Sequence, residues 1–140
     1  MFVVCLVYSK NTKDDEKPWI MVLNKDRGWE LPGGQITENE DFDVAALREL
    51  YEETGLLGTA VGYDENIIEG GVVVLIEVES TPCPEPWDSP DPSILEVGWC
   101  LEAPTRLAWE EKELEKIRGH DWSSSKLSLI HISEPTRLRR

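Results

Sequence analysis

The segment from Gly34 to Leu56 constrains this chain most, because its spacing predicts one helix that gathers several acidic side chains. Its centre reads Arg-Glu-Leu-Tyr-Glu-Glu from Arg48 to Glu53. Residues three and four positions apart are neighbours on an α-helix, so Glu49 meets both Glu52 and Glu53. Three carboxylates this close repel one another unless a cation lies between them. Hard divalent cations such as Mg²⁺ take oxygen ligands and often bridge to phosphates, so the segment predicts a metal site and an anionic substrate.

The surroundings of this acidic run decide between two interpretations. Taken alone, Arg-Glu-x-x-Glu-Glu is more often a solvated helix face with ion pairs four residues apart. Here Gly33 and Gly34 precede it and allow the backbone to pass close to a ligand. Glu40 adds another carboxylate upstream, and Gly55 with Leu56 closes the segment. This arrangement favours a metal site over an ordinary surface.

The same segment matches a known family pattern, the Nudix box G-x5-E-x7-R-E-U-x-E-E-x-G-U, in which U is a bulky aliphatic residue. Its fixed positions are occupied at the required spacing by Gly34, Glu40, Arg48, Glu49, Leu50, Glu52, Glu53, Gly55 and Leu56. The chain therefore resembles the Nudix hydrolases, which cleave a nucleoside diphosphate linked to another group. The resemblance implies an α/β fold, the Nudix-type α/β/α sandwich, whose mixed sheet carries the box as a catalytic loop–helix–loop.

The resemblance also implies which residues bind metal. Glu49, Glu52 and Glu53 would be catalytic residues and the ligands of Mg²⁺ or Mn²⁺, and the backbone carbonyl of Gly33 or Gly34 would complete the site. Bound divalent ions neutralise charge on phosphoryl oxygens and lower the pKa of a bound water, and pyrophosphate hydrolysis requires both.

Glu40 and Arg48 have supporting roles in this interpretation. Glu40 would bind metal through a water or a second ion, and Arg48 would orient the neighbouring glutamates through its bidentate fork. The general base stays open between Glu49 and an acid further along the chain. Glu96, in Glu-Val-Gly-Trp, resembles the late strand of the family and is either a ligand or base, or an acid at a strand edge. Weaker candidates in the proline-rich loop are Glu85 and Asp88.

Substrate contacts are expected just upstream of the box. Lys25 and Arg27 precede the glycines and could bind substrate phosphates together with Gly34, or they could be surface turn residues. Gln35 stands where many relatives carry a basic residue, so phosphate affinity would depend more on the metal. The candidates for base stacking are Phe42, Tyr63 and Trp87, whereas a core position is expected for Trp19, Trp29 and Trp99. Nothing in the sequence selects a nucleobase.

Charge limits the partners that the chain can have. Asp and Glu number 28 against 14 Lys and Arg, which gives a formal net charge of −14. Such a chain repels nucleic-acid polymers, so coating of DNA or RNA is excluded as an expected role. The expected small-molecule partner, a nucleoside phosphate, would be repelled too unless metal ions screen the site.

Cysteine spacing and hydropathy indicate the compartment. Cys5, Cys83 and Cys100 are widely spaced without a C-x-x-C pair, so neither a disulfide framework nor a zinc site is expected. Cys5 and Cys100 lie in apolar runs and are expected to be buried. These features point to a reducing, cytoplasmic location. The apolar run 2–8 is too short to span a membrane, so no membrane association is expected.

The hydrophobic pattern predicts one domain over residues 1–126, with strands and two helices. Strands are expected at 2–9, 18–24, 29–31, 59–63, 71–79 and 94–101, the first of them central, with a hairpin loop at 11–17. Pro32-Gly33-Gly34 is expected to break regular structure. Residues 127–137 resemble a translated sequencing adaptor, so 127–140 is expected to be a non-native tail.

Cap and periodicity signals place the two helices. The first should span 40–54, between an Asn39 N-cap and a Gly55 C-cap. Its buried side is expected to comprise Leu47, Leu50 and Tyr51, with Ala46 and Asp43 at the margin. The second should run from a Thr105 N-cap to Arg118. Its buried side is expected to comprise Leu107, Leu114 and Ile117.

The sequence predicts metal-dependent hydrolysis of a (d)NTP to a nucleoside monophosphate plus pyrophosphate, as in the mutator-type branch of the family. Markers of the ADP-ribose, diadenosine-polyphosphate, NADH and coenzyme A branches are absent, and Gly71 and Val72 stand where the ADP-ribose branch has proline. The open alternatives are an ADP-sugar or dinucleoside-polyphosphate hydrolase, a non-hydrolysing nucleotide sensor, and an acidic domain that acts through protein contacts. Family members are often homodimers, and that state stays open here.

Overall fold

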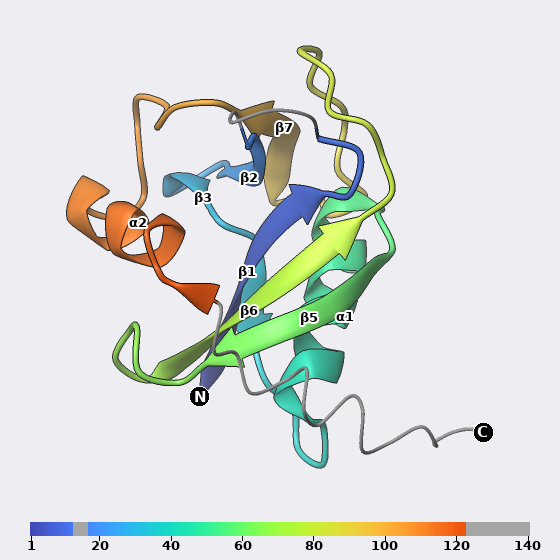
Figure 1. Cartoon of the computed structure of the whole chain (residues 1–140). Helices are drawn as coiled ribbons and strands as arrows, with labels where there is room; N and C mark the ends of the chain where they lie inside the picture. The colour runs from blue at the N-terminus through green and yellow to red at the C-terminus, as the bar shows by residue number, and fades with distance from the viewer. Residues whose placement is uncertain (13–16, 123–140) are drawn as a thin grey trace.

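One mixed β-sheet with a helix on each face makes up the fold, as the sequence predicts (Figure 1). The computed structural model describes residues 1–12 and 17–122. The strands in this part are β1 (Phe2–Ser9), β2 (Trp19–Asn24), β3 (Gly28–Glu30), β4 (Gly33–Gln35), β5 (Gly58–Asp64), β6 (Gly71–Val78) and β7 (Ile94–Cys100). The helices are α1 (Phe42–Thr54) and α2 (Glu111–Arg118).

Strand β1 lies at the centre of the sheet, as its unbroken apolar sequence predicts. It pairs in parallel with β6, from Phe2↔Gly71 to Ser9↔Val78, and antiparallel with β2 and β4. Strand β5 extends the sheet beyond β6, while β3 and β7 both pair with β2. The expectation that the two glycines lie outside regular structure is wrong, since both belong to β4.

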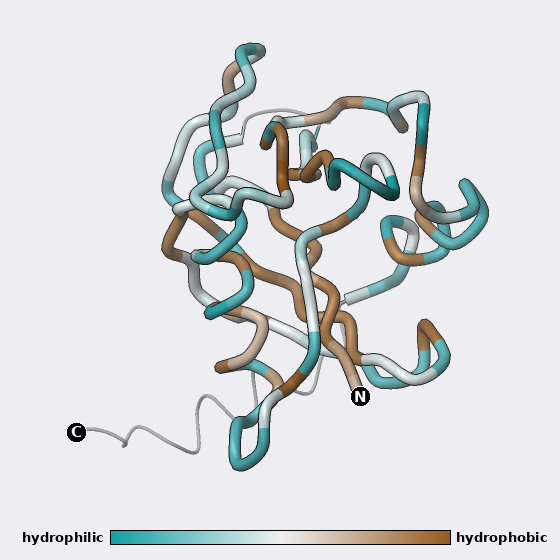
Figure 2. The backbone as a smooth tube through the Cα atoms, turned by 180° about the vertical axis from the view of Figure 1, so that it is seen from behind, coloured by the Kyte–Doolittle hydropathy of each residue, from teal (hydrophilic) through white to brown (hydrophobic). Residues whose placement is uncertain are grey.

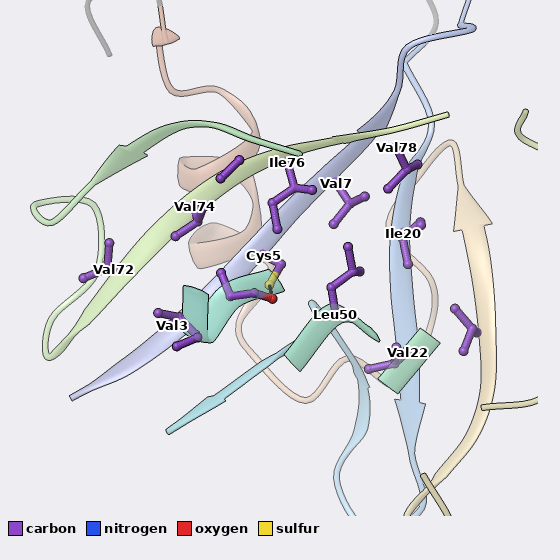
Figure 3. Packing of buried hydrophobic residues seen from close by; sticks show 14 of the residues in the cluster. Val3, Cys5, Val7, Ile20, Val22, Leu50, Val72, Val74, Ile76 and Val78 are labelled. Atoms are coloured by element: carbon purple, nitrogen blue, oxygen red, sulfur yellow. Dashed lines mark hydrogen bonds between the residues drawn. The ribbon is translucent and has the colours of Figure 1, made fainter. Parts of the chain in front are cut away.

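The side chains of β1 alternate between two cores, one on each face of the sheet. Val3 and Cys5 face α1, where the Cys5 thiol donates a hydrogen bond to the Ala46 carbonyl (3.3 Å; Figure 3). Val4 and Leu6 face α2. Alternate strand residues point to opposite faces, so a continuous apolar run fits a strand buried on both sides. In Figure 2 the strands across the middle are brown, whereas the loop before α1 is teal.

Helix α1 begins and ends close to its predicted positions. Its N-cap is Asp41 rather than Asn39, because the chain turns at Asn39 with a left-handed φ of 66°. Gly55 ends the helix as predicted: at φ 80° its N–H donates to the Tyr51 carbonyl (2.9 Å). The expectation that Tyr51 is buried is wrong, since it is 53% exposed. The fully buried helix residues that face β1 are Ala45, Ala46 and Leu50.

Helix α2 begins later than predicted. The expected N-cap at Thr105 is wrong, because the helix starts at Glu111 after an extended Glu110. The preceding segment bonds to β3 instead: Trp29 donates to the Arg106 carbonyl and accepts from the Ala108 N–H, both at 2.8 Å. Backbone groups used by a sheet edge are not available to a helical turn.

The structure also tests the predictions for the cysteines, for the buried residues of α2 and for membrane spans. All three cysteines are free, and Cys5 is buried, whereas Cys100 is only partly buried. Leu114 and Ile117 are buried as predicted, as is Trp19. In the described ranges, no helix has the length and apolar character needed to cross a bilayer. The expected tail at 127–140 and part of the expected loop at 11–17 lie outside the described residues.

Candidate active site

Strand β4 brings the two glycines of the box against the acidic side of α1. A Cβ on Gly34 would lie 2.5 Å from Cδ of Glu49, so only glycine leaves room for this carboxylate. Gly33 donates its backbone N–H to Oε1 of Glu53 at 3.2 Å. The loop–helix–loop thereby encloses two glutamates between a strand backbone and a helix.

Arg48 connects three acidic residues of the box through its guanidinium. Its guanidinium donates to both carboxylate oxygens of Glu40, at 2.7 and 3.0 Å. It also donates to Glu49 (3.1 Å) and Glu52 (3.2 Å). A further bond, to the Gln35 carbonyl (3.1 Å), ties the helix to β4. The hydrogen bonds with Arg48 lower the pKa of Glu40 to about 2, so this pair is charged at neutral pH and fixes the geometry around it.

Glu53 and Glu49 carry the unusual electrostatics of the site. Glu53 is only 9% exposed, and burial raises its pKa to about 8, with smaller contributions from Glu49 and Glu30. The hydrogen bond from Gly33 opposes this rise. Burial raises the pKa of Glu49 as well. Carboxylates that lack solvation are stabilised in the charged form by a nearby cation, so both are suited to hold one.

The described residues fit a divalent cation without forming a ready-made cage. Among them, no three carboxylate, imidazole or thiol groups converge closely enough to hold an ion. Arg48 donates hydrogen bonds to oxygens of Glu49 and Glu52, which a cation would also have to engage. The Glu52 side chain is 53% exposed and has room to rotate. A buried and a partly buried carboxylate beside a glycine backbone form the oxygen-rich donor set that Mg²⁺ or Mn²⁺ prefers.

A cleft of about 220 Å³ opens beside the two glycines, and its walls include Arg27, Glu30 and Trp109. Arg27 donates to both oxygens of Glu30, from Nε at 3.0 Å and from Nη2 at 2.8 Å. Glu30 is 8% exposed, whereas the Arg27 side chain is 62% exposed and can meet an anion. Lys25 is exposed on the turn after β2 and does not line the cleft.

The other acidic candidates lie elsewhere. On β7, Glu96 pairs with Leu23, and its neighbour Val97 pairs with Val22. Both valines belong to the core beneath α1, so strand alternation directs Glu96 to the opposite face of the sheet. Glu85 and Asp88 are exposed in the proline-rich loop. The acid that does line the cleft is Glu30, which the sequence did not single out. Its only signal in the sequence is an acidic residue between the apolar Trp29 and Leu31.

The proline-rich loop caps the end of α1 that carries the buried glutamate. Trp87 donates its indole N–H to the Thr54 carbonyl at 2.8 Å. Ser89 donates its hydroxyl to the Glu53 carbonyl at 2.6 Å. The last carbonyls of a helix have no intrahelical partner, so these side chains satisfy them and fix the last turn. Trp87 is itself held by two backbone bonds with Val97, both at 2.9 Å.

The aromatic residues expected to stack on a base do not line the cleft. Phe42 and Tyr63 pack against each other, with ring centroids 4.4 Å apart, on the core beneath α1. Trp87 binds the helix end, as described above. The aromatic rings that do line the cleft belong to Phe2 and Trp109, which no motif singled out.

The NUDIX domain model matches residues 3–118, which covers most of the chain and, except for Phe2 of β1, all the strands and helices described above. The chain therefore belongs to the Nudix family.

Individual relatives share shorter stretches. YtkD of Bacillus subtilis (strain 168) is 49% identical over 37 residues, which are 26% of this chain and 23% of that protein. An 8-oxo-dGTP diphosphatase of Buchnera aphidicola subsp. Schizaphis graminum (strain Sg) is 38% identical over 58 residues, 39% of this chain and 41% of that protein. The chain thus matches less than half the length of either relative.

A solved structure supports the fold over a longer range. The crystal structure of a NUDIX-family hydrolase from Clostridium perfringens aligns with a TM-score of 0.61 at 17% identity. The alignment covers 84% of this chain and 92% of that one. At this identity the likeness shows the fold alone, and it agrees with the layers described above.

Proposed function

We propose that this chain hydrolyses a nucleoside triphosphate, ribose or deoxyribose, to a nucleoside monophosphate and pyrophosphate in the presence of Mg²⁺ or Mn²⁺. The observation that carries the proposal is the packing of two carboxylates, the buried Glu53 and the partly buried Glu49, against Gly33 and Gly34, which themselves line the cleft. The relative named an 8-oxo-dGTP diphosphatase favours a triphosphate over other nucleotides.

Each residue has a role that follows from its place. Glu49 and Glu53 would hold the cation with Glu52, and the backbone carbonyl of Gly33 or Gly34 would complete the donor set. A bound divalent ion supplies charge neutralisation and a water of lowered pKa. Arg48 positions the acids through Glu40. On the substrate side, the exposed guanidinium of Arg27 would bind phosphate oxygens through Nη1, while its Nε and Nη2 groups bond Glu30 and fix its direction.

Glu49 is the first candidate for the general base, because its carboxylate packs against Gly34, which lines the cleft. Glu96 lies on the face opposite α1, and its role remains a prediction from the sequence alone. Lys25 stays a weaker prediction for phosphate binding, because its side chain is outside the cleft walls.

The test is a panel of (d)NTPs, 8-oxo-dGTP, ADP-ribose and a dinucleoside polyphosphate, each incubated with Mg²⁺, Mn²⁺ or EDTA. We expect metal-dependent release of pyrophosphate from at least one triphosphate and loss of this activity in Glu53→Gln. Glu115→Gln, on the exposed side of α2, is the matched control. Nucleotide binding without any metal-dependent product would instead identify a sensor of the same fold.

A further inference from the structure

The proline-rich loop between β6 and β7 contacts α1 at the residue that carries the buried carboxylate. Trp87 donates its indole N–H to the Thr54 carbonyl (2.8 Å), and Ser89 donates its hydroxyl to the Glu53 carbonyl (2.6 Å). Glu53 and Thr54 are the last two residues of the helix. The Glu53 carboxylate in turn accepts the Gly33 N–H at 3.2 Å. Glu53 is therefore held at its backbone by the loop and at its side chain by β4.

The end of α1 needs partners from outside the helix, because the last carbonyls of a helix have no intrahelical N–H to accept. The Tyr51 carbonyl accepts the Gly55 N–H (2.9 Å). The carbonyls of Glu53 and Thr54 accept from the loop instead. Since the backbone fixes the direction of each Cα–Cβ bond, the backbone of this turn sets the direction in which the Glu53 side chain leaves the helix. The loop thereby helps to determine where the carboxylate lies.

Of the two loop donors, Trp87 is the one anchored to the sheet. Its backbone N–H and carbonyl form two hydrogen bonds with Val97, both at 2.9 Å. Val97 is fully buried and pairs with Val22 of β2. Ser89 is held within the loop itself, where its Oγ accepts the Asp91 N–H at 2.9 Å. Trp87 therefore connects the interior of the sheet to the last turn of α1.

The position of Trp87 gives no support to the stacking role that the sequence suggested. Its side chain packs against the core beneath α1, its N–H is bound to the Thr54 carbonyl, and it does not line the cleft. We propose that Trp87 is instead a positioning residue, which fixes the last turn of α1 so that Glu53 keeps its carboxylate where the cation is held. The inference rests on the proposed metal-dependent hydrolysis and adds to it a residue outside the box.

The sharpest test replaces Trp87 by benzothienylalanine, in which sulfur takes the place of the indole N–H. This analogue keeps the shape of the ring system and loses only the donor to the Thr54 carbonyl. We expect kcat to fall about fivefold with KM unchanged, the effect of one lost hydrogen bond. Mn²⁺ affinity, measured by EPR without substrate, should weaken by a similar factor. Trp87→Phe, which also removes part of the ring system, should lose at least as much.

Two controls separate positioning from a general loss of stability. Trp99→Phe alters another half-buried indole on the same core, but within the described residues only Trp87 donates an indole N–H to α1. Ile117→Val removes a buried methyl group on α2 and should lower the midpoint of urea unfolding. Both controls should keep the wild-type kcat and Mn²⁺ affinity. If the analogue at Trp87 lowers the midpoint but leaves kcat and Mn²⁺ affinity unchanged, Trp87 only stabilises the fold and the proposal is overturned.

The measurement of Mn²⁺ affinity without nucleotide separates this inference from the function on which it rests. If no triphosphate is hydrolysed but the analogue at Trp87 binds Mn²⁺ more weakly than the wild-type chain, the proposed hydrolysis fails and the positioning of a metal ligand stands. If triphosphates are hydrolysed and the analogue matches the wild-type chain in both kcat and Mn²⁺ affinity, only the positioning role fails.

Discussion

The acidic box and the cavity around Trp109 are built in different ways. The box comes from one continuous stretch, in which Arg48 and the glutamates of α1 meet β4 through a dense set of hydrogen bonds. The cavity, of about 300 Å³, is lined by residues from distant segments, among them Phe2, Glu69 and Glu113. The charges of the box are buried or paired, whereas the two acids of the cavity are exposed. The box therefore depends on local sequence, and the cavity depends on tertiary packing.

The largest effect should come from removing the charge of the buried glutamate. Glu53→Gln keeps the shape of the side chain and the Gly33 hydrogen bond can persist, so the fold should survive. We expect kcat to fall by about 10³-fold, since a ligand and its negative charge are lost together. Steady-state kinetics with saturating Mn²⁺ measures this. A variant with wild-type kcat would show that Glu53 does not hold the catalytic cation.

A smaller but diagnostic loss should follow from a single methyl group at the box. Gly34→Ala places a Cβ against the Glu49 carboxylate, so the carboxylate has to leave its position. We expect kcat/KM to fall about 100-fold, because a small displacement of a catalytic group has a large kinetic cost. Gly98→Ala is the matched control, since a Cβ there would meet only Pro86 at 4.0 Å. Equal activity of both variants would refute the close packing of β4 on α1.

The same contrast explains which parts could be predicted from the sequence. The box residues lie close together in sequence, so helical spacing alone brings Glu49, Glu52 and Glu53 to one side of α1. Strand β1 was equally clear, because its apolar run fits only an interior position. The Trp109 cavity gave no such signal, since its walls become neighbours only through the parallel pairing of β1 with β6 and the placement of α2.

Tertiary structure also decided two points that the local sequence predicted wrongly or left open. Residues 106–108 were expected to be helical, but their backbone groups bond to Trp29 at the edge of β3. The sequence left Glu96 open between a metal ligand or base and an acid at a strand edge, and strand alternation directs it to the face opposite α1 once Val97 is fixed in the core. Tertiary hydrogen bonds overrode local propensity in the first case, and sheet register decided the second.

The pH dependence of stability should distinguish the buried acid from the exposed ones. Burial raises the pKa of Glu53 from about 4.5 to about 8, so the folded state binds its proton more tightly than the unfolded state. Its contribution is therefore fully present below pH 4.5 and is lost as pH rises through 8. In EDTA at pH 9, we expect Glu53→Gln to be more stable than wild type by about 2–3 kcal/mol in urea unfolding.

Two comparisons make that result specific to burial. The stability difference between Glu53→Gln and wild type should disappear at pH 4, where both side chains are neutral in the folded state. Glu113→Gln, which removes an exposed acid of the Trp109 cavity, should show no comparable gain in stability at pH 9. If the difference in stability between Glu53→Gln and wild type did not change with pH, the Glu53 carboxyl would be solvated like the exposed acids of the chain.

The smallest effect should come from the loop that caps α1. Ser89→Ala removes the hydrogen bond to the Glu53 carbonyl without touching the carboxylate, so we expect about 1 kcal/mol of lost stability and a three- to fivefold fall in kcat. Ser89→Thr restores the hydroxyl and should recover both. If Ser89 positions the glutamate, Mn²⁺ affinity measured by EPR without substrate should weaken in the alanine variant while KM stays the same. If stability falls but Mn²⁺ affinity and kcat do not, the loop only caps the helix. In that case α1 alone is rigid enough to hold the glutamates of the box in place.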